Sequence, residues 1–119
     1  MKHRVTRCGK GDRHEFDWGS ITWFHSGDFT GSSEVSLGEV IIKSGCANPA
    51  HTHSNCEEVL LLLAGELHHT CGDETSYDLK PGDSICIQAG IPHNATTTSK
   101  CAARMIVAYS SAYREMQGE

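Results

Sequence analysis

Three histidines and one glutamate of this chain have the side-chain types that divalent metal ions bind in proteins. His51 and His53 stand two residues apart. Because side chains alternate between the two faces of a β-strand, both imidazoles point to the same face. Glu58 begins the next apolar run and can reach that face from a neighbouring strand, and His93 follows a Pro-Gly-Asp turn further along the chain. We expect these four residues to hold one divalent ion.

The chemistry of such an ion follows from its open coordination positions. An octahedral ion that takes four ligands from the protein keeps two positions for water, substrate or dioxygen. An open position distinguishes a catalytic metal site from a closed structural site. Imidazole and carboxylate ligands suit zinc, nickel, manganese and iron about equally, so the native metal stays open.

One alternative concerns the carboxylate ligand. Glu57 lies beside Glu58, and alternation along a strand directs the two side chains to opposite faces. A register shift of one residue would make Glu57 the ligand in place of Glu58. We prefer Glu58.

Two further histidines are candidates for catalysis. His68 and His69 are adjacent, so one of them faces the interior if they lie on a strand. That imidazole could line a substrate cavity or act as a general base. The alternative is one exposed histidine and one packed polar residue. The roles of His25, Cys46 and Cys56, which lie near aromatic or histidine residues, are left open.

Strand signals dominate the elements that must position these side chains. Segments rich in β-branched and alternating apolar residues are bounded by Gly, Pro, Asn and Asp. The expected strands are Ile21–His25, Val35–Ile42, Ala50–Ser54, Glu58–Leu63, Glu66–Cys71, Thr75–Leu79, Ser84–Ile87, His93–Thr98 and Ala102–Tyr109. Short strands at close spacing predict an all-β sandwich or barrel.

The connections carry their own signals. Gly72-Asp73 predicts a hairpin turn, and Lys80–Asp83 has Pro and Gly in the order of a type II turn. Ser26–Ser33 is rich in Gly and Ser and predicts a surface loop. Only Ser110–Gln117 favours a short helix, with Ser110 or Ser111 as its N-cap.

Length and charge limit the remaining possibilities. A chain of 119 residues is expected to form one domain, residues 1–119. A net charge of −5 without a basic cluster argues against nucleic acid and anionic membranes as partners. The first residues lack the apolar core of a secretory signal. We therefore expect a cytoplasmic protein with six reduced cysteines.

The residues around the histidine pair resemble the first signature of the cupin superfamily. That signature reads glycine, five residues, His-x-His, three or four residues, glutamate, six residues, glycine. Here Gly45, His51, His53, Glu58 and Gly65 occupy every fixed position. The six-residue interval before Gly65 supports Glu58 as the acid of the signature.

A second cupin signature is matched less completely. Gly82, Gly90 and His93 occupy its fixed positions, and His93 is the ligand position. Gln88 stands where proline is usual, and Thr97 stands where asparagine is usual. These departures concern the geometry of the loops rather than the ligand.

The resemblance to small single-domain bacterial cupins implies a double-stranded β-helix, or jelly-roll barrel, of two antiparallel sheets. Its core would span about residues 35–109, with the four ligands pointing into its mouth around one ion. An open jelly roll leaves strand edges. We expect residues 3–24 to cover one edge at a homodimer interface.

Three functions are compatible with these features. The leading hypothesis is a metal-dependent isomerase, lyase or similar enzyme that acts on a small polar molecule, such as a keto acid, a hydroxy acid or a sugar derivative. The second is an iron dioxygenase. The third is a module that binds or senses a small ligand without turnover, because a fold does not fix a function.

Overall fold

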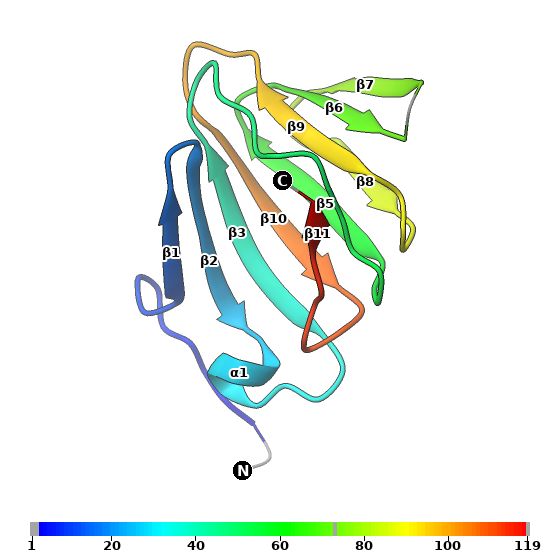
Figure 1. Ribbon diagram of the computed structural model, residues 1–119. Helices are drawn as coiled ribbons and strands as arrows, with labels where there is room; N and C mark the ends of the chain where they lie inside the picture. Colours follow the sequence, from blue (N-terminus) through cyan, green and yellow to red (C-terminus); the bar gives the residue numbers. More distant parts are fainter. Residues whose placement is uncertain (1–2, 73, 119) are drawn as a thin grey trace.

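Two antiparallel β-sheets make up most of the molecule (Figure 1). The computed structural model describes residues 3–72 and 74–118. Its strands are β1 (Asp12–Phe16), β2 (Gly19–His25), β3 (Ser36–Ile42), β4 (His51–Thr52), β5 (Glu58–Ala64), β6 (Leu67–Cys71), β7 (Thr75–Leu79), β8 (Ser84–Ile87), β9 (His93–Thr97), β10 (Ala103–Tyr109) and β11 (Gln117–Gly118). Within this described part, a four-residue turn of helix, α1 (Gly27–Thr30), completes the set.

The order of the strands shows how segments distant in sequence become neighbours. One sheet has the order β1-β2-β3-β10-β5-β8, and the other has the order β11-β4-β9-β6-β7. The paired strands are antiparallel. The expectation of an all-β jelly-roll barrel of two antiparallel sheets is confirmed.

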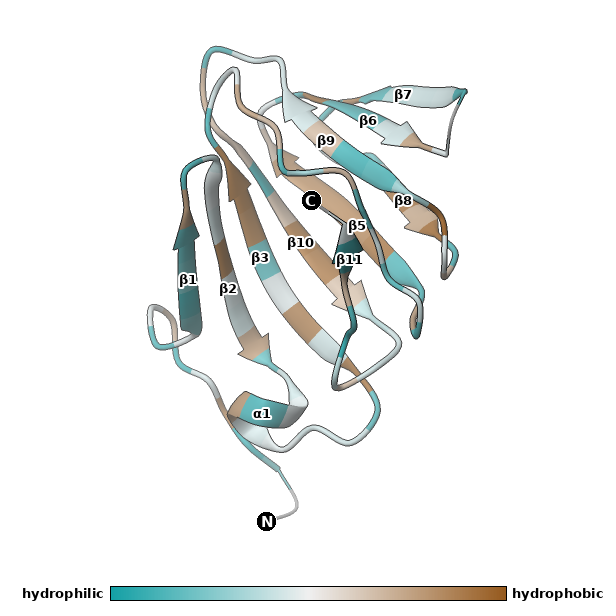
Figure 2. Cartoon of the chain, viewed as in Figure 1, coloured by the Kyte–Doolittle hydropathy of each residue, from teal (hydrophilic) through white to brown (hydrophobic). Residues whose placement is uncertain are grey.

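Strict alternation of burial builds the core between the sheets. Every second residue of β3 and of β10 is buried, as the period of two in a strand requires. Ile42, Leu62, Leu67, Met105 and Val107 are at most 1% exposed. Figure 2 shows the resulting apolar character of β3, β5 and β10 beside the polar edge strand β1. This core holds the strands that carry the candidate site.

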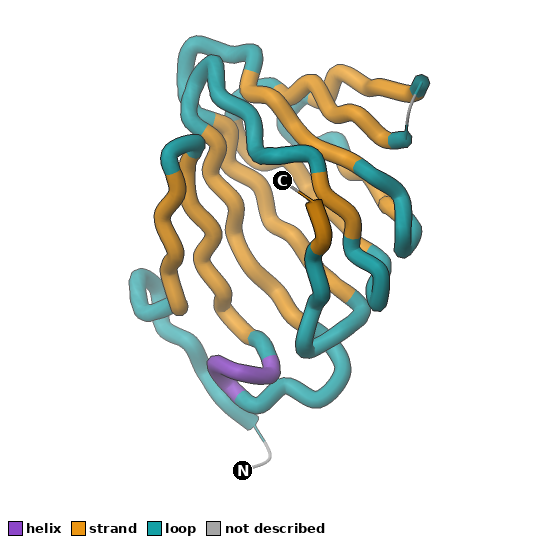
Figure 3. The backbone as a smooth tube through the Cα atoms, viewed as in Figure 1, coloured by secondary structure: helices purple, strands orange, loops and turns teal. Residues whose placement is uncertain are grey.

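The C-terminal segment differs from the prediction. Residues 110–116 are not helical, and β11 pairs with β4, so the expected helix over Ser110–Gln117 is wrong. The Asn55 side chain donates to the Tyr113 carbonyl at 2.8 Å and accepts from the Glu115 backbone N–H at 2.8 Å. These tertiary bonds replace the hydrogen bonds of a helix. Figure 3 shows the segment before β11 as a loop.

Two smaller predictions change, and a third is confirmed. The expected loop Ser26–Ser33 contains α1, because the Ser26 hydroxyl accepts from the Phe29 backbone N–H and caps the turn. The expected strand Ala50–Ser54 is reduced to the two residues of β4. The β6–β7 hairpin forms as expected, although Asp73 of its turn lies outside the described residues.

The N-terminal strands enlarge the first sheet. β2 pairs with β3, and β1 forms the outer edge. The assignment of residues 3–24 to a dimer interface stays a prediction. No helix in the described ranges is long and apolar enough to cross a membrane.

Candidate metal centre

Both sheets contribute to the cluster of histidine and glutamate side chains. His51 lies on β4 and is paired directly with His93 on β9. His53 follows β4 and returns to the same face two residues later. Glu58 starts β5 in the opposite sheet. The cluster thus forms where the two sheets face each other.

The four side chains converge closely enough to share one ion. Each offers one ligand atom, and these atoms all lie within 4.8 Å of one another. His53, Glu58 and His93 are at most 4% exposed, whereas His51 is half-buried at the open side. One side of the cluster is therefore open to a small molecule.

Backbone carbonyls set the tautomer of all three imidazoles. The Nδ1 atoms of His51, His53 and His93 donate to the carbonyls of Pro49, Glu115 and Ile91, respectively, at 2.7 to 3.0 Å. A carbonyl only accepts, so each Nδ1 carries a proton. In the neutral ring the Nε2 lone pair is then left free for a metal ion.

The centre of the cluster fits a cation. Nε2 of His53 and Nε2 of His93 each lie 3.1 Å from the Oε1 atom of Glu58. The buried Nε2 of His53 has no hydrogen-bond partner. Neutral imidazoles with protonated Nδ1 would direct lone pairs at a carboxylate oxygen, which is repulsive. A proton or a divalent ion between them removes this repulsion.

The electrostatics of the cluster agree with this arrangement. Burial alone would raise the pKa of Glu58, but the imidazoles of His53 and His93 beside it hold that pKa well below its usual range. Burial lowers the pKa of His51 to about 4. Burial also acts to lower the pKa of His93, but the contact with Glu58 outweighs it and raises this pKa. Glu58 is thus ionised and His51 neutral at pH 7.

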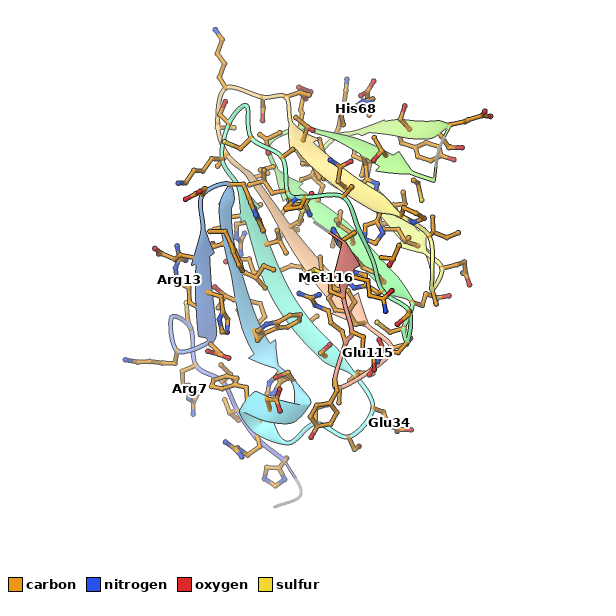
Figure 4. The ribbon with its side chains drawn as sticks, viewed as in Figure 1. Arg7, Arg13, Glu34, His68, Glu115 and Met116 are labelled. Carbon is orange, nitrogen blue, oxygen red and sulfur yellow. The ribbon has the colours of Figure 1, made fainter. Side chains whose placement is uncertain are left out.

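A cavity of about 150 Å³ adjoins the cluster. His51, Glu58 and His93 form part of its wall. Most of the remaining wall is apolar and comes from Phe16, Trp18, Ile21, Val40, Ile42, Leu60, Ala95, Met105 and Val107. Met116 on the C-terminal segment also lines it (Figure 4).

The two candidate catalytic histidines point in opposite directions. His69 is 1% exposed and lines the cavity, with its ring nearly parallel to that of His93 at a centroid distance of 5.8 Å. Burial lowers the pKa of His69 to about 4, and its Nδ1 has no hydrogen-bond partner. His68 lies outside, with Nδ1 2.8 Å from Asp78 (Figure 4). Only His69 can touch a molecule in the cavity.

Two cavity residues were not singled out from the sequence. The guanidinium of Arg114 lies over the rings of Trp23 and Tyr109, at 5.1 and 5.2 Å from their centroids. The ring of Tyr109 in turn packs edge-on against His53 at 5.0 Å. Arg114 lies in the segment expected to be helical, and no local pattern associates it with the histidines. Tyr109 ended an expected strand, but nothing marked it as a site residue.

The residues whose roles were left open lie behind or outside the cluster. Cys56 is buried, and burial raises the pKa of its thiol, so it is not a ready thiolate ligand. Cys46 is half-buried, and all six cysteines, each of them within the described ranges, are unpaired. His25 lies 3.1 Å from the Thr30 hydroxyl, away from the cavity.

The two departures from the second signature have structural roles. The Thr97 hydroxyl is buried and donates to the Ile42 carbonyl at 2.9 Å, which ties β9 to the end of β3. The Gln88 amide donates to the Glu57 carboxylate at 2.7 Å. That contact holds Glu57 away from the cluster, which contains Glu58 and not Glu57.

Comparisons with known proteins agree with this fold. The family described as Cupin domain matches residues 38–109. A curated relative, quercetin 2,3-dioxygenase of Bacillus subtilis (strain 168), is 36% identical over 93 residues, which are 76% of this chain and 26% of the relative. The chain thus spans about a quarter of the length of that relative.

Solved structures show the same architecture. Oxalate decarboxylase of Lactobacillus farciminis, in a formate complex, matches with a TM-score of 0.82 and 16% identity over 91% of this chain and 33% of that chain. The polyketide cyclase RemF of Streptomyces resistomycificus matches with a TM-score of 0.80 and 20% identity, over 99% of this chain and 85% of that chain. At these identities the likeness concerns the fold.

Proposed function

This chain belongs to the cupin family, and from that premise we propose that it is a metal-dependent enzyme for a small polar molecule such as a keto acid, a hydroxy acid or a sugar derivative. One observation carries the proposal. Three imidazoles with protonated Nδ1 atoms and one ionised carboxylate bring their ligand atoms within 4.8 Å of one another beside a cavity. An isomerase or lyase reaction is compatible with this site.

In this proposal His51, His53, Glu58 and His93 hold one divalent transition metal ion. A bound ion of this kind would polarise a carbonyl or hydroxyl oxygen and lower the pKa of a neighbouring C–H or O–H group. The family includes proteins with different metals, so zinc, nickel, manganese and iron all remain candidates. The carbonyls that bind the three Nδ1 atoms orient the imidazoles before any ligand arrives.

His69 is our proposed general base. Its lowered pKa keeps it neutral at pH 7, and it lines the cavity beside His93. A neutral imidazole can take a proton from a carbon or hydroxyl group of the bound molecule and return it at another atom. His68 has no part in this proposal, because it lies outside the cavity.

The metal assignment is tested by elemental analysis of protein purified without affinity-resin metal. We expect about one ion per chain in the wild type and none in the double variant His51→Ala/His93→Ala. His68→Ala is the matched control and should keep its ion. An ion that persists in the double variant would show that the metal binds elsewhere.

Turnover is tested with the metal-loaded protein and a panel of 2-oxo and 2-hydroxy acids and sugar derivatives. Ligands are first selected by the rise in Tm that binding causes. Mass spectrometry then shows whether each selected ligand is altered. A changed ligand supports an enzyme, whereas ligands that bind and are recovered unchanged support a binding or sensing module.

The sequence match to a quercetin dioxygenase favours a second candidate, an iron dioxygenase. It predicts oxygen uptake by the protein reconstituted with ferrous ion in the presence of a substrate. Tightly held zinc or nickel after purification, together with no oxygen uptake after iron reconstitution, would contradict it.

We also propose that the chain acts as a single cupin domain in a homodimer, with residues 3–24 at the interface. β1 leaves an open edge on the first sheet, and such edges need a cover. Light scattering should give twice the mass of one chain. A monomeric mass would contradict this arrangement.

A further inference from the structure

Arg114 is the only Lys or Arg among the described residues that line the cavity. It shares that wall with three members of the metal cluster, namely His51, Glu58 and His93. The guanidinium group of arginine is a cation in proteins. An anionic group that enters the cavity therefore meets one protein cation.

The guanidinium is held but not neutralised. It lies over the rings of Trp23 and Tyr109, which attract a cation through their π-faces. Its buried Nε atom has no hydrogen-bond partner. In residues 3–72 and 74–118, no ion pair involves Arg114, whereas Arg13 and Arg104 pair with glutamates. A buried donor without a partner is costly, and a carboxylate would satisfy it.

The backbone on both sides of Arg114 is fixed by a single side chain. Asn55 donates to the Tyr113 carbonyl at 2.8 Å and accepts from the Glu115 backbone N–H at 2.8 Å. The residues before and after Arg114 are therefore anchored to the loop that follows His53. Anchoring of this kind orients the guanidinium before a ligand binds, which reduces the entropy cost of binding.

The remaining wall limits the body of the ligand. It is mostly apolar, with Trp18, Ile21, Leu60 and Met105 among its residues. A cavity of about 150 Å³ is comparable with one that accommodates benzene. The hydroxyl groups of a sugar would lose their hydrogen bonds to water against such a wall, at a cost in free energy. An apolar body with one anionic end fits better.

We propose that Arg114 binds the carboxylate of the substrate, and that the substrate is a small 2-oxo or 2-hydroxy acid with an apolar side chain. The inference rests on the proposed function, since it uses the same cavity and places the acid beside the metal cluster. The planar guanidinium can donate two parallel hydrogen bonds to a carboxylate. Arg114 then selects acids over neutral molecules of the same shape.

The test compares mandelate with its neutral analogue mandelamide by isothermal titration calorimetry on the metal-loaded protein. We expect the wild type to bind mandelate at least about tenfold more tightly than mandelamide, and more tightly than lactate, which lacks the apolar body. Arg114→Met should lower the affinity for mandelate about tenfold or more and leave that for mandelamide unchanged. Arg114→Lys keeps the charge but loses the planar fork, so its affinity for mandelate should lie between those of the wild type and Arg114→Met.

Arg104→Met is the matched control, because Arg104 is exposed, pairs with Glu39 and does not line the cavity. It should behave as the wild type. A wild type that binds both probes equally, or does not bind mandelate, overturns the inference. So does an unchanged preference for mandelate in folded Arg114→Met, because the metal alone would then select the acid. If Arg114→Met does not fold, the affinity of Arg114→Lys for mandelate is compared with that of the wild type, and equal values overturn the inference.

Elemental analysis separates this inference from the proposed function. A wild type without metal that still prefers mandelate through Arg114 would overturn the metal-dependent function and leave the role of Arg114 in place. If the wild type holds one ion per chain but Arg114→Met does not change the affinity for mandelate, the metal assignment stands and the role of Arg114 is overturned.

Discussion

The Nδ1 atom of His53 donates a hydrogen bond to the backbone carbonyl of Glu115, at 3.0 Å and across 62 residues of chain. The C-terminal segment thereby sets the tautomer of a candidate metal ligand. The same segment carries Arg114 into the cavity wall and continues into β11, which pairs with the strand that carries His51. The C-terminal residues therefore act on the metal cluster and on the cavity together.

Asn55→Ala is expected to weaken metal binding although Asn55 is no ligand. Its loss frees the segment that supplies the carbonyl for His53. Loss of a hydrogen-bond partner of a metal ligand typically lowers the metal affinity 10- to 100-fold, so we expect the Kd for the metal ion to rise about tenfold. Competition with a chromogenic chelator measures it. Ser54→Ala, which removes only a bond to the exposed Glu115 carboxylate, is the control. Equal Kd values for the two variants would contradict this link.

Glu58→Gln should abolish tight metal binding, whereas Glu57→Gln should not. Glu58 is inside the cluster, and Glu57 is bound to Gln88 outside it. In the metal-free protein, Glu58→Gln should also lower the pKa of His93. The carboxylate of Glu58 raises that pKa, and without it the opposing effect of burial dominates. An NMR titration of the His93 ring tests this, and an unchanged His93 pKa would argue against the contact.

The metal-free protein should lose stability on mild acidification, in part through His69. Its folded-state pKa of about 4 lies below the ordinary value of 6.5. Between these pH values the unfolded chain binds a proton that the folded chain does not, so stability falls as the pH drops. One pKa unit corresponds to about 1.4 kcal/mol, which limits the contribution to about 3 kcal/mol.

Urea unfolding at pH 7 and pH 4.5 measures this loss in the wild type and in His69→Gln. The variant lacks the titrating group and should lose about 2 kcal/mol less over the same interval. His51, whose pKa is also lowered to about 4, is present in both proteins and cancels in the comparison. Identical losses would mean that His69 is not held neutral by the fold.

The two glycines that bound the first signature should differ in their tolerance of alanine. Both have a positive φ, 75° at Gly45 and 80° at Gly65. A Cβ at Gly65 would lie 2.7 Å from the Ala103 Cα and 2.8 Å from the Ala102 carbonyl oxygen, whereas one at Gly45 meets no atom within 4 Å. Gly45→Ala should cost about 1 kcal/mol through backbone strain. Gly65→Ala should cost at least about twice that in urea unfolding, and equal costs would contradict the close approach.

Features determined by near neighbours in the chain were predictable from the sequence. The alternation of side chains predicted the strands that form the core, and the spacing of His51 and His53 predicted a shared face. Turn chemistry predicted the β6–β7 hairpin. The strand register favoured Glu58 over Glu57, and the structure has Glu58 in the cluster. These features depend on backbone sterics and on a period of two, which a short window of sequence contains.

Only the tertiary structure decided which distant groups meet. The sequence left His68 and His69 equivalent, and the pairing of β6 with β7 and β9 turned His69 inward. The sequence predicted a helix over Ser110–Gln117, where the hydrogen bonds of Asn55 hold a non-helical segment instead. Arg114 reached the cavity through that segment. Contacts across about 60 residues depend on the path of the whole chain and on the free energy of packing, for which a local pattern carries no signal.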